Sequence, residues 1–148
     1  MPDRLSEPLE RKKPALYFVD SMSDPFHERV PFGYVRQAFD VMARAPQHTF
    51  QVLTKRARRM AELCAGLAVP GNVWLGVSVE NRKHGLPRIP WLRGIQAPVR
   101  FLSIEPLLED LGRFDLSGIQ WAIVGGERRS KSANGRLYAG QVWDAMPA

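Results

Sequence analysis

Five short apolar runs divide the chain into intervals of similar length. They begin at residues 15, 49, 73, 99 and 121 and are rich in the β-branched and aromatic residues that favour strands. Most of them are apolar without alternation, as in parallel strands that are buried on both faces. The runs are 15–19, 49–53, 73–77, 99–104 and 121–124. The pattern therefore predicts five strands of a parallel sheet.

Helical patterns lie between the runs. Apolar residues at helical spacing predict amphipathic helices over 31–44 and 56–65. The interval 82–94 predicts a weaker helix because prolines interrupt it, and 107–116 predicts a connector with at most one helical turn. The strand starts are separated by 34, 24, 26 and 22 residues. Such spacing leaves room for the crossovers that parallel strands require.

Alternating strands and crossovers indicate an α/β fold with a parallel sheet. The spacing fits both a doubly wound sheet and a barrel. A complete eight-fold barrel takes about 250 residues, whereas this chain has 148. We therefore predict a partial parallel (β/α) barrel of about five β/α units over residues 1–127. Such a sheet leaves open edges and an exposed apolar face, so we expect self-association.

Residues 128–148 differ in character from the rest of the chain. They begin with a basic stretch that is rich in small residues. This composition predicts a loop or a disordered tail, with a weak helix at the end.

Polar or charged residues follow every predicted strand. The carboxyl ends of parallel strands meet at one edge, where such folds bind their ligands. The sequence therefore predicts a ligand-binding rim, and the alternative is that the chain simply turns polar where each strand ends. The candidate rim residues are Asp20, Ser21, Asp24, Lys55, Arg56, Ser78, Glu80, Asn81, Glu105, Gly125, Gly126 and Glu127.

Two kinds of chemistry are open to this rim. Its carboxylates would bind Mg²⁺ or Mn²⁺ in a metal-dependent enzyme. Lys55 and Arg56 would hold a phosphate or a carboxylate. Gly125 and Gly126 would let a ligand approach the backbone, although the spacing of a dinucleotide fingerprint is absent. The four carboxylates are those of Asp20, Glu80, Glu105 and Glu127.

The three histidines lie in different settings. His27 stands beside the carboxylates of Asp24 and Glu28, so a metal or acid–base role and a structured loop are both open. His48 directly precedes a strand, at the edge opposite to the rim, and we expect it to be structural. His84 is expected in a loop.

The charge and the single cysteine narrow the function further. A net charge of +6 and a basic run over 55–59 keep open a non-catalytic module that binds nucleic acid or nucleotides. Cys64 stands alone, so this chain forms no internal disulfide and supplies no cysteine-ligated iron–sulfur cluster. We expect a cytoplasmic protein with no membrane association, because no apolar stretch approaches the length of a membrane span.

Five segments together resemble a phage-associated protein family of unassigned function. They are "FVDSMSDPFHERVP", "VMARAPQHTFQVLTKRARRM", "NVWLGVSVEN", "VRFLSIEPLL" and "IQWAIVGGE". The resemblance runs from about residue 5 to residue 127, and members of the family look like partial barrels of the radical-SAM/TIM-like type. It implies that the candidate rim residues face S-adenosylmethionine or the substrate.

The resemblance also implies cofactors that this chain does not hold alone. Full-length relatives begin with three cysteines that would hold an iron–sulfur cluster, which in turn binds S-adenosylmethionine. This chain has only Cys64. The resemblance therefore implies a truncated form that is inactive alone and depends on a missing N-terminal segment or a separate chain. Residues 128–148 also depart from the family pattern, which continues with a serine–glycine stretch.

Overall fold

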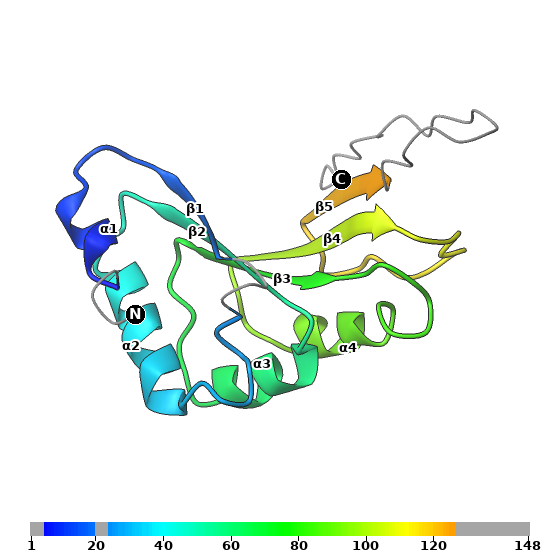
Figure 1. Ribbon diagram of the computed structural model, residues 1–148, viewed down its shortest axis with the longest axis horizontal. Coiled ribbons are helices and arrows are strands. Elements are labelled where there is room, and N and C mark those ends of the chain that lie inside the picture. The colour runs from blue at the N-terminus through cyan, green and yellow to red at the C-terminus, as the bar shows by residue number, and fades with distance from the viewer. Residues whose placement is uncertain (1–4, 20–23, 127–148) are drawn as a thin grey trace.

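Five parallel strands form one sheet whose spatial order, β1-β2-β3-β4-β5, repeats the order of the chain. The computed structural model describes residues 5–19 and 24–126. The sheet curls as half of a barrel, with the longer helices on its outer side (Figure 1). The predicted five-stranded parallel partial barrel is therefore confirmed. The strands are β1 (Leu16–Val19), β2 (Thr49–Thr54), β3 (Val73–Ser78), β4 (Val99–Leu107) and β5 (Trp121–Gly126).

Three helices connect the first four strands. They are α2 (Phe32–Ala43), α3 (Ala57–Cys64) and α4 (Arg88–Arg93), and a short α1 (Glu7–Glu10) precedes β1. Helix α4 is short because it starts only after Pro87, and Pro90 is tolerated within its first turn, where the missing N–H would have no partner. None of the helices in the described ranges is long and apolar enough to cross a membrane.

The connection between β4 and β5 differs from the prediction. Strand β4 continues to Leu107 instead of ending at residue 104, and the described residues contain no helix between it and β5. The interval 107–116 is therefore a connector, as predicted, and it lacks the one helical turn that the sequence left open. The carboxylate of Asp110 accepts the N–H of Gly112 at 2.8 Å, and Gly112 and Gly118 have φ angles of +68° and +74°. These turns favour a loop over a helix.

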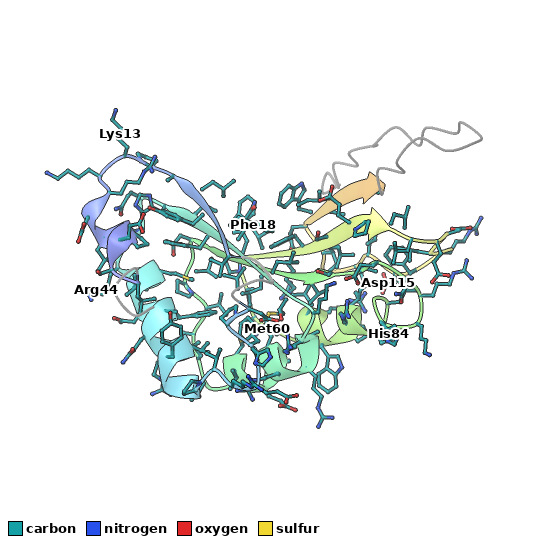
Figure 2. The ribbon with its side chains drawn as sticks, viewed as in Figure 1. Lys13, Phe18, Arg44, Met60, His84 and Asp115 are labelled. Atoms are coloured by element: carbon teal, nitrogen blue, oxygen red, sulfur yellow. The ribbon has the colours of Figure 1, made fainter. Side chains whose placement is uncertain are left out.

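The main core lies between the sheet and the helices. Val52, Leu75 and Leu102 point to this outer side from neighbouring strands and are completely buried. Met60 of α3, also fully buried, points toward the sheet (Figure 2). Each such side chain contributes about 1.5–3 kcal/mol when it is removed from water.

No helix of the described residues lies over the other face of the sheet, and we call it the inner face. Phe18 points away from the helices and is 50% exposed (Figure 2). Deeper on this face Phe101 is fully buried and its ring centroid lies 5.6 Å from that of Trp121. The inner face comprises Leu16, Phe18, Gln51, Leu53, Trp74, Gly76, Ser78, Phe101, Ser103, Glu105, Trp121, Ile123 and Gly125.

Candidate functional site

The predicted rim lies at the carboxyl ends of the strands, but only part of it is described. Asp20, Ser21 and Glu127 lie outside the described residues. Most of the other candidates fall into two ion-pair networks on the outer side of the rim and one group on the inner face. Gly126 has no atom within 4 Å of the position that a Cβ would take.

The first network is built on the buried carboxylate of Asp24. It accepts hydrogen bonds from the hydroxyl of Thr54 at 2.8 and 2.9 Å, from the N–H of Phe26 at 2.9 Å and from Arg56 at 2.8 Å. Thr54 is itself fully buried at the end of β2. The network therefore fastens the loop that follows β1 to the end of β2, and both Asp24 and Arg56 are occupied in doing so.

The second network is built on Glu80. Its two carboxylate oxygens pair with Lys55 at 2.5 Å and with Arg88 of α4 at 2.8 Å, and Arg88 also donates to the carbonyl of Ser78 at 2.7 Å. Burial raises the pKa of Glu80, but the hydrogen bonds from Lys55, from the backbone and from Arg88 outweigh it and hold the pKa below its usual value. An open pocket of about 340 Å³ adjoins this network. Its lining residues are Lys55, Glu80, Asn81, His84, Arg88, Pro106 and Leu108.

Glu80 gives a prediction for stability in acid. Because its pKa is lowered in the folded chain, the unfolded chain takes up this proton at a higher pH than the folded chain does. Its contribution to the free energy of unfolding is therefore complete above about pH 4.5 and is lost as the pH falls through the folded pKa. We expect the wild-type chain to lose more unfolding free energy on acidification than Glu80→Gln, as measured by urea unfolding at several pH values. Parallel pH profiles for the two chains would contradict this role.

The third group lies on the inner face. Ser78 and Ser103 are register partners on β3 and β4, and Glu105 follows two residues later on the same face. Within residues 5–19 and 24–126 no hydrogen bond or ion pair engages the two hydroxyls or the carboxylate of Glu105. A Cβ at Gly125 would overlap the carboxyl group of Glu105, so the glycine leaves room for it. The inner rim thus carries one exposed carboxylate and, deeper on the same face, the hydroxyls of two largely buried serines.

The rings of His48 and His27 have structural contacts within the chain, and His84 lies in the loop between β3 and α4, as expected. The Nε2 of His48 donates to the carbonyl of Pro8 at 3.0 Å, and its Nδ1 accepts the N–H of Ala15 at 3.1 Å. It therefore holds the segment around α1 and β1 against β2, in agreement with the structural role expected. The Nδ1 of His27 accepts the N–H of Arg29 at 3.1 Å, which favours the structured loop.

The basic run over 55–59 is occupied by contacts within the chain. Lys55 and Arg56 pair with carboxylates, Arg58 pairs with Glu62 at 2.8 Å, and Arg59 donates to the carbonyl of Val30 at 3.1 Å. Each of its four cations therefore has a partner already. This arrangement weakens the argument that the run was placed to bind a polyanion.

The residues expected to bind a divalent metal are only partly described. Of the four carboxylates, those of Asp20 and Glu127 lie outside the described ranges. Glu80 pairs with two cations. Among the residues whose positions are described, no group of three histidine, cysteine, aspartate or glutamate side chains is arranged to hold a metal ion.

Cys64 does not fit an iron–sulfur cluster. It lies on α3, faces the core and is buried, and this burial raises the pKa of its thiol to about 11. A cluster requires several thiolates at an accessible site, and this chain has one cysteine. The residues present therefore do not supply the cluster that the family resemblance implies.

The raised pKa of Cys64 gives a further prediction. Because only the thiolate reacts rapidly with disulfide reagents, we expect the native chain to react with a chromogenic disulfide at least about 100-fold more slowly than the urea-unfolded chain at pH 8. The measurement is the rate of colour release in each state. Equal rates would show that the thiol is accessible and not held in the core.

Sequence reasoning missed three residues of the rim. Thr54 and Ser103 stand at the ends of predicted strands, so the same strand-end argument would have found them. Arg88 had no such signal, because its contact with Glu80 depends on where α4 packs.

A larger groove lies at the opposite edge of the sheet. It has a volume of about 1090 Å³ and is lined mostly by small and apolar residues from 61–71 and 94–100. Its one charged residue, Arg100, donates to the carbonyls of Ile95 and Gly118 at 2.7 and 3.2 Å. The groove therefore lacks the reactive groups that the carboxyl rim provides.

Comparisons with known proteins identify a family and no individual relative. Neither the curated proteins nor the solved structures contain a match to this chain. Residues 1–129 match the family described as "Protein of unknown function (DUF5131)", and the chain belongs to that family.

Proposed function

We propose that this chain is the ligand-binding part of a radical-SAM-like barrel from a phage-associated lineage. Its carboxyl rim binds S-adenosylmethionine or the substrate, and the chain has no radical activity by itself. The observation that carries the proposal is the curled, all-parallel sheet whose carboxyl ends present polar groups on the inner face. In parallel α/β folds this edge is where ligands bind.

In this proposal the residues of this chain bind and position the ligand, and they do not supply the iron–sulfur cluster. Cys64 is buried on the helix side of the sheet. Any iron–sulfur cluster would therefore come from an N-terminal segment or a separate chain in the cytoplasm. The networks of Asp24 and Glu80 hold the loops that follow the strands, and Glu105 with its two neighbouring hydroxyls faces the ligand.

Calorimetric titration of the chain with S-adenosylmethionine tests the proposal. We expect saturable binding that ATP at the same concentration does not reproduce. No heat of binding at the highest soluble concentration of S-adenosylmethionine would overturn the assignment. Anaerobic reconstitution with iron and sulfide is the second arm, and we expect no stoichiometric cluster because the chain has a single cysteine.

Two alternatives rest on narrower observations. A module that binds nucleic acid or nucleotides is favoured by the net charge of +6. Its affinity would fall steeply with salt, which a titration of labelled single-stranded DNA at two salt concentrations measures. A carboxylate-rim metal enzyme is favoured by the carboxylate of Glu105 on the inner rim, which has no ion-pair partner among the described residues. The test of this metal-enzyme alternative is a titration with Mn²⁺, which would broaden the NMR resonances of residues at that rim.

A further inference from the structure

The carboxylate of Glu105 lies at the inner rim, beside the end of the neighbouring strand. It lies directly against the backbone of Gly125 on the neighbouring strand, in the space that any side chain at that position would need. The side chain is exposed, and no cation lies within ion-pair distance of it in the part of the chain that the structure describes. A carboxylate left unpaired beside an apolar surface attracts a positively charged ligand.

An aromatic layer lies on the same face, further from the rim. Phe101 and Trp121 are register partners, and the ring of Trp121 also packs edge-on against Trp74 with 5.7 Å between centroids. Between this layer and Glu105 lie the hydroxyls of Ser78 and Ser103. Successive inner-face residues on one strand are about 6.6 Å apart. Toward the rim, the inner face therefore changes from aromatic side chains to hydroxyls and then to a carboxylate. A small molecule is long enough to span this distance.

We propose that the inner rim recognises the protonated amine of a small molecule that has an aromatic or aliphatic body. Glu105 determines this specificity by pairing with the ammonium group, and the two serine hydroxyls accept its remaining protons. The body packs on the apolar layer below, where aromatic faces also favour a nearby cation. This inference deepens the proposed function, and it rests on it only in taking the carboxyl rim as the ligand site.

Two probes of similar size, with the same phenylethyl body and opposite charge, test the inference. They are 2-phenylethylamine and 3-phenylpropionate, titrated into the full chain and followed by NMR shifts of backbone amides. We expect the amine to bind with a Kd of about 1–10 mM, as befits so small a ligand, and the acid to bind at least about tenfold more weakly. Glu105→Gln should weaken the amine by about tenfold, because it removes the charge and retains the shape.

The matched control is Glu28→Gln, which removes an exposed carboxylate from the segment between β1 and α2 and should leave the affinity unchanged. Gly125→Ala should weaken the amine as Glu105→Gln does, because its methyl group would displace the carboxylate. If Gly125→Ala fails to fold, Glu105→Gln alone tests the role of the carboxylate. Because the side chain of Glu105 is exposed, we expect this variant to fold, and circular dichroism will check it. Equal binding of the two probes, or an unchanged affinity in Glu105→Gln, would overturn the inference.

The two proposals fail in different ways. If the amine binds through Glu105 while S-adenosylmethionine does not bind, the proposed function is wrong and the amine site stands. If S-adenosylmethionine binds and the amine does not, Glu105 is not an amine receptor and only this inference is lost.

Discussion

Replacing Asp24 by alanine should lower the free energy of unfolding by about 2–4 kcal/mol. Its carboxylate accepts from Thr54, Phe26 and Arg56, and the alanine would leave a buried hydroxyl, a buried N–H and a cation without their partner. Arg56 is 38% exposed and regains some hydration, which is why we place the loss below that of a fully buried pair.

Urea unfolding of Asp24→Ala beside Asp40→Ala measures this loss. Asp40 also faces an arginine, Arg44, but at 3.8 Å and with both side chains largely exposed. That control should change the free energy of unfolding by no more than about 0.5 kcal/mol. Similar losses in the two variants would show that neither the burial nor the hydrogen bonds of Asp24 add to the free energy of unfolding. Asp24→Asn should lie between them, since an amide oxygen still accepts from Thr54.

Replacing Gly76 by alanine should cost about 2–3 kcal/mol or more. A Cβ at this position would lie 2.5 and 2.6 Å from two ring carbons of Phe101, which is fully buried and packed against Trp121. Because buried side chains are closely packed, the sheet or the aromatic layer must shift to make room for the methyl group.

Gly126→Ala is the matched control for this glycine, because the same atom added there meets nothing within 4 Å. We expect a change within about 0.5 kcal/mol for it in urea unfolding. The double variant Gly76→Ala with Phe101→Leu should lose less than the sum of its two single variants, since the smaller side chain relieves the overlap. Strict additivity would mean that the ring is not what the added methyl group meets.

The strands and the longer helices were predictable from the sequence. Each strand contains a largely apolar run, and α2 and α3 carry apolar residues at helical spacing, so local pattern and tertiary burial agree. The interval before β5 was predicted as a connector, but the extension of β4 to Leu107 was not. Turns at Asp110 and Gly112 follow this extension, although the sequence carries apolar residues at 107, 108 and 111.

The candidate site was predictable only in its position. The rule that strand ends converge placed Ser78 and Glu105 at one rim, where the structure has them. It did not reveal that Lys55 and Arg56 pair with Glu80 and Asp24, because these contacts join residues far apart in the chain. Ion pairing of this kind depends on loop geometry, which a local pattern does not contain. The two cations expected to hold an anion are therefore already paired within the chain.

The matching of spatial and sequence order in the sheet has a consequence during synthesis. Every strand lies beside the one that precedes it, so a chain that leaves the ribosome from its N-terminus can add each strand to a finished edge. The step from Thr49 to Val73 takes about 1–5 s at ordinary rates of translation. During each such interval the edge of the last strand added is unpaired. The position of this unpaired edge therefore changes as synthesis proceeds. At each stage a chaperone or a neighbouring nascent chain competes with the next strand for the edge.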